Sequence, residues 1–359
     1  MDVSEKLKLI KEVGEEIVTE QELEELLQTK KNLIAYDGFE PSGTNIHIAQ
    51  GLLRAINVNK MTKAGVKFKM LVADWHAWAN NKMGGNLDHI QKVGKYLIEV
   101  WKACDMDLDN IEFIWASELV KDDIYWKTVM QIARNSTVKR IQRCGQIMGR
   151  KEAEVQQASQ ILYPCMQAAD IFYLKADICQ LGMDQRKVNM LAREIGPKLG
   201  YWKPVVISHH MLMGLQKPPE NIASTEERVM ELKMSKSKPD SAIFMDDSYE
   251  EIKKKIQKAY CLEKIVKENP ILEYCKYIIF EKFDTFLIKR SEKWGGNLEF
   301  KGYKELENVF EKGKLHPMDL KAAVAEYLNK LIEPIRDKLK KSKTAQKLKE
   351  EIKLFKITR

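Results

Sequence analysis

The feature that most constrains the fold is an alternation of short apolar runs with helical stretches between residues 33 and 208. Helical patterns at 87–104 and 123–150 lie among strand-like runs at 33–36, 67–73, 111–115, 176–181 and 205–208. A chain that alternates in this way buries its strands between helices. The pattern therefore predicts an α/β protein with a mainly parallel, doubly wound sheet and right-handed crossovers.

The regions around this alternating part have a different pattern. Residues 120–173 are helical throughout and predict an insertion between two halves of the sheet. Residues 5–30 read as helices, with Thr19 and Glu22 spaced as a capping box, and no convincing strand pattern follows Lys264. We therefore predict N-terminal helices at 1–30, an α/β domain at 31–245 with a loop at 216–240, and a smaller helical domain at 246–359.

Composition excludes several classes of protein. The 359 residues are 44% hydrophobic, and no apolar run approaches the ~20 residues that span a membrane. Charged residues crowd the N-terminus, which argues against a signal peptide. The six cysteines form no CxxC pair and the six histidines have no zinc-like spacing. We expect a cytoplasmic protein with reduced thiols, no structural metal and no membrane partner.

The net charge of +8 is concentrated near the C-terminus, where residues 331–359 hold ten Lys or Arg against four Asp or Glu. A basic face of this kind attracts phosphate backbones through counterion release. The same pattern is typical of a solvated amphipathic helix. Charge alone leaves both interpretations open.

The stretch YDGFEPSGTNIHIAQG, residues 36–51, follows the first predicted strand. Gly38, Pro41 and Gly43 break the strand before a helical pattern begins near His47. The start of a helix presents unpaired N–H groups that suit phosphate, and strand–turn–helix junctions build ligand sites in α/β proteins. A histidine at this place, taken alone, is more often a capping or packing residue.

A second polar segment, KMSKS at 233–237, lies on a loop beyond the fifth predicted strand. Lys233 and Lys236 flank a serine and are poorly suited to a core. Lysine ammonium groups are compact point charges that hold polyphosphates. A solvated basic loop is the alternative, but the pairing with a histidine-headed helix favours a nucleotide site.

The third constellation is the helical stretch ILYPCMQAADIFY. Tyr163, Gln167 and Asp170 share one face of it, while their neighbours are almost all apolar. Buried polar groups need partners, so either an internal hydrogen-bond network or a ligand must satisfy them. The stripe is ~10 Å long, comparable to an amino acid with a polar group at each end.

Together these segments resemble the tyrosyl-tRNA synthetases, class I enzymes, in their archaeal and eukaryotic branch. The resemblance covers roughly residues 30–335. HIAQ is similar to the family signature usually written HIGH, and KMSKS matches the second signature. YPCMQAADI, QLGMDQRKVNMLARE and LHPMDLK match further family segments in the expected order. The resemblance implies a Rossmann-type catalytic domain followed by a helical anticodon-binding domain.

The resemblance also assigns substrate-binding residues. Tyr36 and Asp170 would hold the phenolic hydroxyl of L-tyrosine, and Asp170 would then lack a partner if phenylalanine entered. The ammonium group would be held by Tyr163, Gln167 and Gln185, and His76 would complete the pocket.

For ATP, the resemblance implies attack of the ionised tyrosine carboxylate on the α-phosphate, with Mg²⁺-pyrophosphate leaving. No general base is needed for this step, so positioning and charge stabilisation must supply catalysis. The catalytic residues implied are His47, Gln50, Lys233 and Lys236. The ATP-binding residues implied are Gly38, His47, Ala49, Gly182, Asp184, Lys233, Met234, Ser235 and Lys236. Ala49 and Gln50 depart from the HIGH signature, although Gln can still donate to an oxygen.

For tRNA(Tyr), the resemblance places Arg143 and Arg186 at the acceptor stem. Asp319 would read the first anticodon base, with His316 beside it in the same HPMD segment, and Trp294 would stack on that base. The family is usually a homodimer, with the helical insertion at the interface.

Three other interpretations of the sequence compete with this one. Tryptophanyl-tRNA synthetases share the fold and a KMSxS loop, but the phenol pair Tyr36 and Asp170 argues against them. An unrelated nucleotidyltransferase does not explain KMSKS together with the C-terminal residues. A catalytically inactive RNA-binding relative predicts loss of the lysines or of the helical stripe, and both remain.

Overall fold

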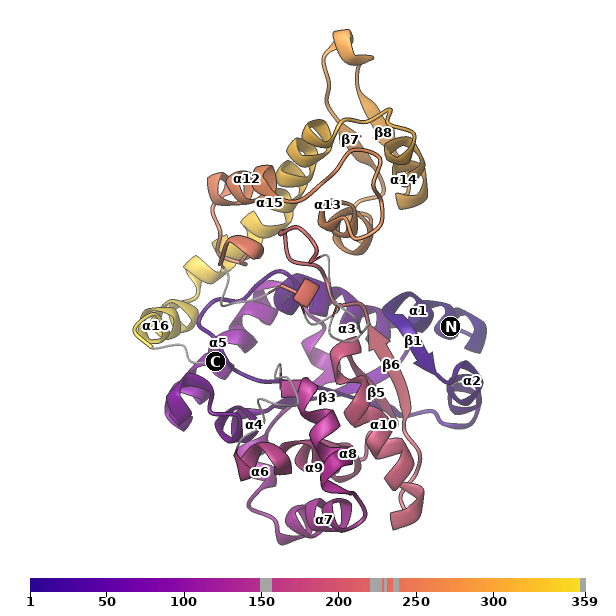
Figure 1. Cartoon of the computed structure of the whole chain (residues 1–359), viewed down its shortest axis with the longest axis vertical. Coiled ribbons are helices and arrows are strands. Elements are labelled where there is room, and N and C mark those ends of the chain that lie inside the picture. Colours follow the sequence, from indigo (N-terminus) through magenta and orange to yellow (C-terminus); the bar gives the residue numbers. More distant parts are fainter. Residues whose placement is uncertain (149–156, 220–227, 229–230, 235–238, 356–359) are drawn as a thin grey trace.

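The computed structural model describes residues 1–148, 157–219, 228, 231–234 and 239–355 (Figure 1). Its centre is a six-stranded sheet in the order β1-β6-β5-β2-β3-β4. The strands are β1 (Gly14–Val18), β2 (Leu33–Phe39), β3 (Val66–Val72), β4 (Ile111–Trp115), β5 (Ile178–Gly182) and β6 (Val205–His209). All neighbours pair in parallel except β1, which is antiparallel to β6. The predicted doubly wound parallel sheet is confirmed.

Helices cover both faces of the sheet because alternate residues of each strand point to opposite sides. In β2, Ala35 belongs to one apolar core and Tyr36 to the other. The first core contains residues of α1 (Val3–Val13), α2 (Glu20–Thr29), α3 (Arg54–Lys63), α4 (Asp74–Ala79) and α5 (Leu87–Ala103). The second contains residues of α6 (Ala116–Leu119), α7 (Asp123–Arg134), α8 (Val138–Arg143), α9 (Ala158–Tyr173) and α10 (Arg186–Ile195).

The N-terminal region differs from its prediction. Helices were expected throughout residues 5–30, but Gly14–Val18 forms strand β1 at the sheet edge. Its sequence GEEIV lacks the apolar run that marks the inner strands, because β1 is only partly buried. The prediction was wrong here, since long-range pairing with β6 decides the conformation of this segment.

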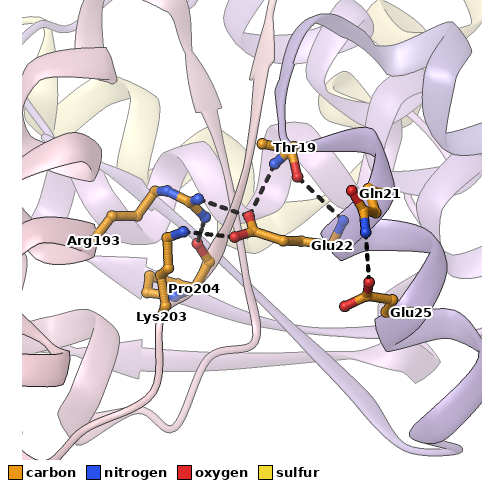
Figure 2. A network of polar contacts seen from close by, with 7 residues as sticks. All are labelled: Thr19, Gln21, Glu22, Glu25, Arg193, Lys203 and Pro204. Carbon is orange, nitrogen blue, oxygen red and sulfur yellow. Dashed lines mark hydrogen bonds and ion pairs between the residues drawn. The ribbon is translucent and has the colours of Figure 1, made fainter.

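The capping box of α2 is confirmed, and it also ties this region to the sheet (Figure 2). The hydroxyl of Thr19 accepts from the backbone N–H of Glu22, whose carboxylate accepts from the backbone of Thr19. The same carboxylate pairs with Arg193 at 2.6 Å and with Lys203 at 2.7 Å. Burial alone raises the pKa of Glu22, but these two cations lower it to about 2.

The helical insertion lies between β4 and β5, as predicted, and contains α7, α8, the 3₁₀ turn Cys144–Met148 and α9. Within the described residues it has no strand. The stretch expected as one helix at 123–150 is divided, because Asn135 ends α7 and Thr137 caps α8. Figure 1 shows α7 at the end of the molecule opposite the C-terminal region.

The polypeptide after residue 245 is mainly helical, with α12 (Tyr249–Lys258), α13 (Pro270–Tyr274), α14 (Tyr303–Glu311), α15 (Pro317–Lys341) and α16 (Lys343–Ile352). The expectation that no strand follows Lys264 was wrong, because β7 (Phe286–Ile288) and β8 (Leu298–Phe300) form an antiparallel hairpin. Each strand has only three residues, too few for a periodic signal. The boundary at 245 remains a prediction.

The basic C-terminal helix returns to the α/β domain. The end of α15 and α16 pack against α5 (Figure 1), where Lys338 pairs with Asp105, just after α5, and Glu351 of α16 pairs with Lys92 of α5. Part of the basic tail thus serves packing, and its contact with a phosphate backbone remains a prediction. Of the helices that the structure describes, none has the length and apolar character needed to cross a bilayer.

Candidate active site

The predicted site residues meet at the point in the sheet where the connections between strands run in opposite directions. Strands β2 and β5 are neighbours, yet the chain leaves β2 toward β3 on one side and β5 toward β6 on the other. A crevice forms at the carboxyl ends of the strands at such a switch point. Tyr36 lies in the middle of β2, Gly38 comes from its end, and Gly182 ends β5.

Asp170 on α9 forms the centre of one end of the site, and its carboxylate is fully buried. Its Oδ2 lies 3.0 Å from Nε2 of His76 and accepts from the hydroxyl of Tyr36 at 3.4 Å. Its Oδ1 accepts from the hydroxyl of Tyr125 at 2.9 Å. A buried carboxylate is costly without such partners, and here three side chains from β2, α4 and α7 supply them.

The electrostatics of this cluster keep the hydroxyls protonated. Burial, followed by the charge of Asp170, raises the pKa of Tyr36 and of Tyr125 well above the usual value. Burial alone lowers the pKa of His76, but the adjacent carboxylate of Asp170 raises it overall. The cluster therefore presents neutral hydroxyl donors beside one negative charge.

The helical stripe predicted on α9 is buried as one face. Tyr163 packs edge-on against the His76 ring, with ring centroids 5.1 Å apart, which extends the cluster toward the next turn of α9. Between Tyr163 and Asp170, about one turn from each, the Gln167 amide donates to Oε1 of Gln185 at 3.0 Å. The amide of Gln185 in turn donates to the carbonyl of Ile147 at 3.2 Å. The structure thus brings Gln185 to the middle of the stripe.

The nucleotide end of the site joins β5 to the segment that begins KMSKS. Nζ of Lys233 lies 2.8 Å from Oδ2 of Asp184. Burial lowers the pKa of Lys233, but the carboxylate raises it overall, and Lys233 keeps the pKa of Asp184 below its usual value despite burial. Met234 is buried in the apolar core, so its side chain packs rather than faces a nucleotide. Ser235 and Lys236 lie outside the described residues.

Two glycines allow close approach of backbone to the site. A Cβ on Gly182 would lie 2.4 Å from Sδ of Met211 and 2.7 Å from Oδ1 of Asp184. A Cβ on Gly38 would lie 3.0 Å from the Tyr36 hydroxyl oxygen. Neither position leaves room for a larger residue without movement of its neighbours.

His47 lies at the entry to a short π-helical turn, Ala49–Leu53, that leads into α3. The backbone N–H of Gln50 donates to Nδ1 of His47 at 3.3 Å, so in the neutral ring Nε2 carries the proton and is a donor. Oε1 of Gln50 is buried and makes no hydrogen bond within the described part of the chain. The predicted helix start is therefore present, though its first turn is not α-helical.

Two residues of the site were missed from the sequence. Tyr125 lies inside a regular amphipathic helix, and only the packing of α7 on α9 shows its contact with Asp170. Asp37 is fully buried beside Tyr36, 3.4 Å from Nε of Arg54. Burial, only partly opposed by Arg54, raises the pKa of Asp37 to about 6. A charged residue within an apolar strand was a signal that could have found it.

The residues predicted to contact tRNA lie in two parts of the structure. Arg143 is exposed at the end of α8, and Arg186 begins α10, where its guanidinium pairs with Glu16 at 2.6 Å. Trp294 is 66% exposed, in the 3₁₀ turn Glu292–Trp294 between β7 and β8, at the far tip of the molecule (Figure 1). His316 is exposed and caps α15, and Asp319 lies in its first turn.

Arg290 connects the hairpin that contains Trp294 with the start of α15. Its Nη1 donates to the carbonyl of Lys314, just before α15, and its Nε donates to Gly296 inside the hairpin. The hairpin with Trp294 and the start of α15 therefore form one surface. Among the described residues, no cluster of three or more His, Cys, Asp or Glu is arranged to hold a metal ion.

Comparison with known proteins agrees with this geometry. A family model described as tRNA synthetases class I (W and Y) matches residues 28–333. Tyrosine–tRNA ligase 1, cytoplasmic, of Arabidopsis thaliana is 51% identical in an alignment 361 positions long that covers 100% of this chain and 90% of that protein. Tyrosine–tRNA ligase of Thermococcus kodakarensis is 44% identical in an alignment 374 positions long that covers 99% of this chain and 100% of that protein.

Among solved structures, the tyrosyl-tRNA synthetase of Pyrococcus horikoshii, complexed with L-tyrosine, matches with a TM-score of 0.90 and 40% identity. The match covers 98% of this chain and 100% of that one. The chain therefore belongs to the class I aminoacyl-tRNA synthetases. Within them it belongs to the tyrosyl-tRNA synthetases, the tyrosine–tRNA ligases, in their archaeal and eukaryotic branch. The family, the fold and the enzyme class expected from the sequence are confirmed.

Proposed function

We propose that the chain activates L-tyrosine with ATP at this crevice and transfers the tyrosyl group to the terminal adenosine of tRNA(Tyr). The observation that supports tyrosine as the substrate is the buried carboxylate of Asp170. A carboxylate offers about four lone-pair sites, of which the hydroxyls of Tyr36 and Tyr125 occupy two, with Nε2 of His76 3.0 Å from Oδ2. In the proposed complex the phenol of a bound tyrosine donates to Asp170, and the single O–H of Tyr36 turns from Asp170 to donate to the phenol oxygen.

Selectivity follows from the same contacts. A phenylalanine ring has no hydroxyl, so it would fill the space without donating to Asp170 or accepting from Tyr36, which would keep their bond to each other. Selectivity therefore comes from the two bonds that only a phenol makes, since a site built to bond a substrate hydroxyl rejects the analogue that lacks it. At the other end of the stripe, Tyr163, Gln167 and Gln185 supply oxygens for the ammonium group. The site therefore recognises both the phenol and the ammonium group of one amino acid.

Activation needs charge stabilisation rather than proton transfer. The tyrosine carboxylate oxygen forms a bond to the α-phosphorus of ATP, and the bond to the bridging oxygen breaks as magnesium pyrophosphate leaves. Nε2 of His47, the ammonium of Lys233 and that of Lys236 supply positive charge or donors to these phosphates. In the proposed arrangement Asp184 binds the ribose. The carboxylate of Asp184 lies beside Lys233. Mg²⁺ enters as MgATP, that is, with the substrate.

Transfer to tRNA needs a second surface. Arg143 and Arg186 supply acceptor-stem contacts, and the exposed ring of Trp294 supplies a stacking platform for the anticodon. Asp319, with His316 beside it, reads the first anticodon base. The connection through Arg290 supports this assignment, because it holds the platform and the start of α15 in one unit.

A second copy of the chain is the proposed partner of the helical insertion. Ile124, Met130 and Val138 are 60%, 53% and 61% exposed on α7 and α8. Exposed large apolar side chains on an interaction surface favour association, and a homodimer through the insertion would cover them. We further propose a cytoplasmic location, in line with the six cysteines, which are all free and buried.

The test is ATP–pyrophosphate exchange measured in parallel with tyrosine, phenylalanine and tryptophan. The proposal expects exchange with tyrosine alone, and loss of it in Asp170→Asn, which keeps the shape but removes the charge. Exchange driven by tryptophan would favour the tryptophanyl alternative. No exchange with any amino acid, with tRNA binding retained, would favour the inactive RNA-binding relative.

A further inference from the structure

The backbone position of Lys233 is set by the segment that follows β6. Gly214 donates to the carbonyl of Leu232 at 2.7 Å, and Met234 donates to the carbonyl of Leu212 at 3.3 Å. These two bonds flank Met213 and Lys233, which face each other as an isolated antiparallel bridge. In such a pair the N–H and C=O of Met213 point away from Lys233. A third element must therefore satisfy them.

That element is α13, the second helix of the C-terminal region. Oε2 of Glu273 accepts from the backbone N–H of Met213 at 3.0 Å. The hydroxyl of Tyr274 donates to the carbonyl of Met213 at 3.3 Å, and Tyr274 is completely buried. Two adjacent side chains thus replace the strand that would otherwise pair with this edge of Met213.

Glu273 is itself held in place. Its Oε2 also lies 3.0 Å from Nε2 of His210, and the other ring nitrogen of His210 lies 3.1 Å from Glu15 on β1. The His210 ring stacks on Tyr277 at a centroid distance of 4.2 Å. The rotamer of Glu273 is therefore fixed by contacts from β1, from the end of β6 and from the helical turn after α13.

We propose that Glu273 and Tyr274 are positioning residues for Lys233, acting through Met213. The inference rests on the proposed role of Lys233 at the ATP phosphates. The first helices of the C-terminal region then have a second task besides supporting the RNA-facing hairpin: they hold the strand from which the lysine reaches the nucleotide. Glu273 and Tyr274 bond to the backbone of Met213, so their proposed effect on Lys233 is indirect.

The experiment measures the single-turnover rate of tyrosyl-adenylate formation, with equilibrium tyrosine binding and the melting temperature as separate readouts. Glu273→Ala and Tyr274→Phe each remove one bond to Met213, and each is expected to slow adenylate formation on the order of tenfold. Tyrosine binding is expected to stay near that of the wild type. The melting temperature is expected to fall moderately, because Glu273→Ala takes one carboxylate from His210 and each variant leaves a backbone group of Met213 without its partner. Glu273→Gln keeps an acceptor oxygen and is expected to restore most of the rate.

Glu15→Ala is the matched control for Glu273→Ala. Both variants remove a carboxylate from His210, but only Glu273 reaches Met213. A slowing by Glu15→Ala as large as that by Glu273→Ala would overturn the proposal, since the effect would then come from His210. Tyr277→Phe is the corresponding control for Tyr274→Phe, because its ring adjoins the same cluster without a bond to Met213.

A double-mutant cycle with Lys233→Ala separates this inference from the proposed function. If Glu273 acts through Lys233, Glu273→Ala has little further effect once Lys233 is gone. An equal slowing in both backgrounds would show that Glu273 acts elsewhere, and would refute the inference while leaving the role of Lys233 intact. A Lys233→Ala variant with normal adenylate formation would remove the proposed role of Lys233 and, with it, this inference.

Discussion

The hydroxyl of Tyr125 donates to Oδ1 of Asp170 across 2.9 Å, joining helices whose two residues are 45 positions apart in the chain. Tyr125 lies buried on α7, and the residue before it, Ile124, points about 100° away around that helix and is exposed. One helix therefore carries both a partner of the carboxylate that we propose binds the substrate and part of the surface that we assign to a second copy.

Tyr125→Phe is expected to weaken tyrosine activation without unfolding the protein. The variant removes one donor from a charged, buried acceptor, a loss of about 1.5–3 kcal/mol. That loss corresponds to a decrease in kcat/KM for tyrosine on the order of tenfold or more. ATP–pyrophosphate exchange at varied tyrosine concentration measures it, with the KM for ATP as the internal reference.

Tyr173→Phe provides the control for that experiment. The ring of Tyr173 packs edge-on against Tyr125 at 5.6 Å, but its hydroxyl donates to Asp122 instead of Asp170. Its loss is expected to leave tyrosine activation near the wild-type level. Equal effects of the two variants would mean that Tyr125 acts through general packing of α7.

Ile124→Glu is expected to shift the chain from dimer to monomer. A carboxylate at the centre of an apolar interface loses its hydration without gaining a partner, so the association should weaken by at least about tenfold in dissociation constant. Analytical ultracentrifugation over a range of concentrations measures the shift. Leu262→Glu introduces the same charge at a side chain that is 52% exposed outside the insertion. A matching shift in that variant would exclude α7 as the interface.

Asp319→Ala and Trp294→Ala are expected to impair tRNA charging while sparing adenylate formation. Both residues lie on the surface joined by Arg290, and Figure 1 shows β7 and β8 at the end of the molecule away from α9, which carries Asp170. Loss of a stacking platform costs about 1–3 kcal/mol per base, which should appear as a raised KM for tRNA(Tyr). Aminoacylation and pyrophosphate exchange, measured on one preparation, distinguish the steps. A parallel fall in both would identify these residues as structural.

Local patterns in the sequence predicted the inner strands and the stripe on α9, because a buried parallel strand and a helix face each have a short repeat. The same patterns missed β1, whose conformation depends on pairing with a strand nearly two hundred residues away. They also missed the β7–β8 hairpin, because three-residue strands have no measurable period.

The residues of the candidate site also fall into two groups: those that local sequence patterns predicted and those that only the tertiary structure shows. Tyr36, Asp170 and Lys233 were found because their polarity conflicts with their neighbours or because they form a recognisable motif. Tyr125 and Glu273 were not found, since a tyrosine and a glutamate inside amphipathic helices are ordinary residues. Their importance depends on which element packs against them, and only the tertiary structure shows that α7 meets α9 and that α13 meets Met213.

Stability should fall between neutral and alkaline pH because of His210. Burial alone lowers the pKa of His210, but its bonds to Glu15 and Glu273 raise it to about 9, above the usual 6.5. The neighbouring His209 stays neutral, since burial lowers its pKa to about 3. Because the folded-state pKa of His210 is raised, its contribution is complete below pH 6.5 and disappears as the pH rises through about 9. It amounts to at most about 3 kcal/mol. Urea unfolding of the wild type and of His210→Gln at pH 6 and pH 9.5 measures it: the difference between the two proteins should shrink at the higher pH, whereas a constant difference would mean that His210 stabilises the fold without its charge.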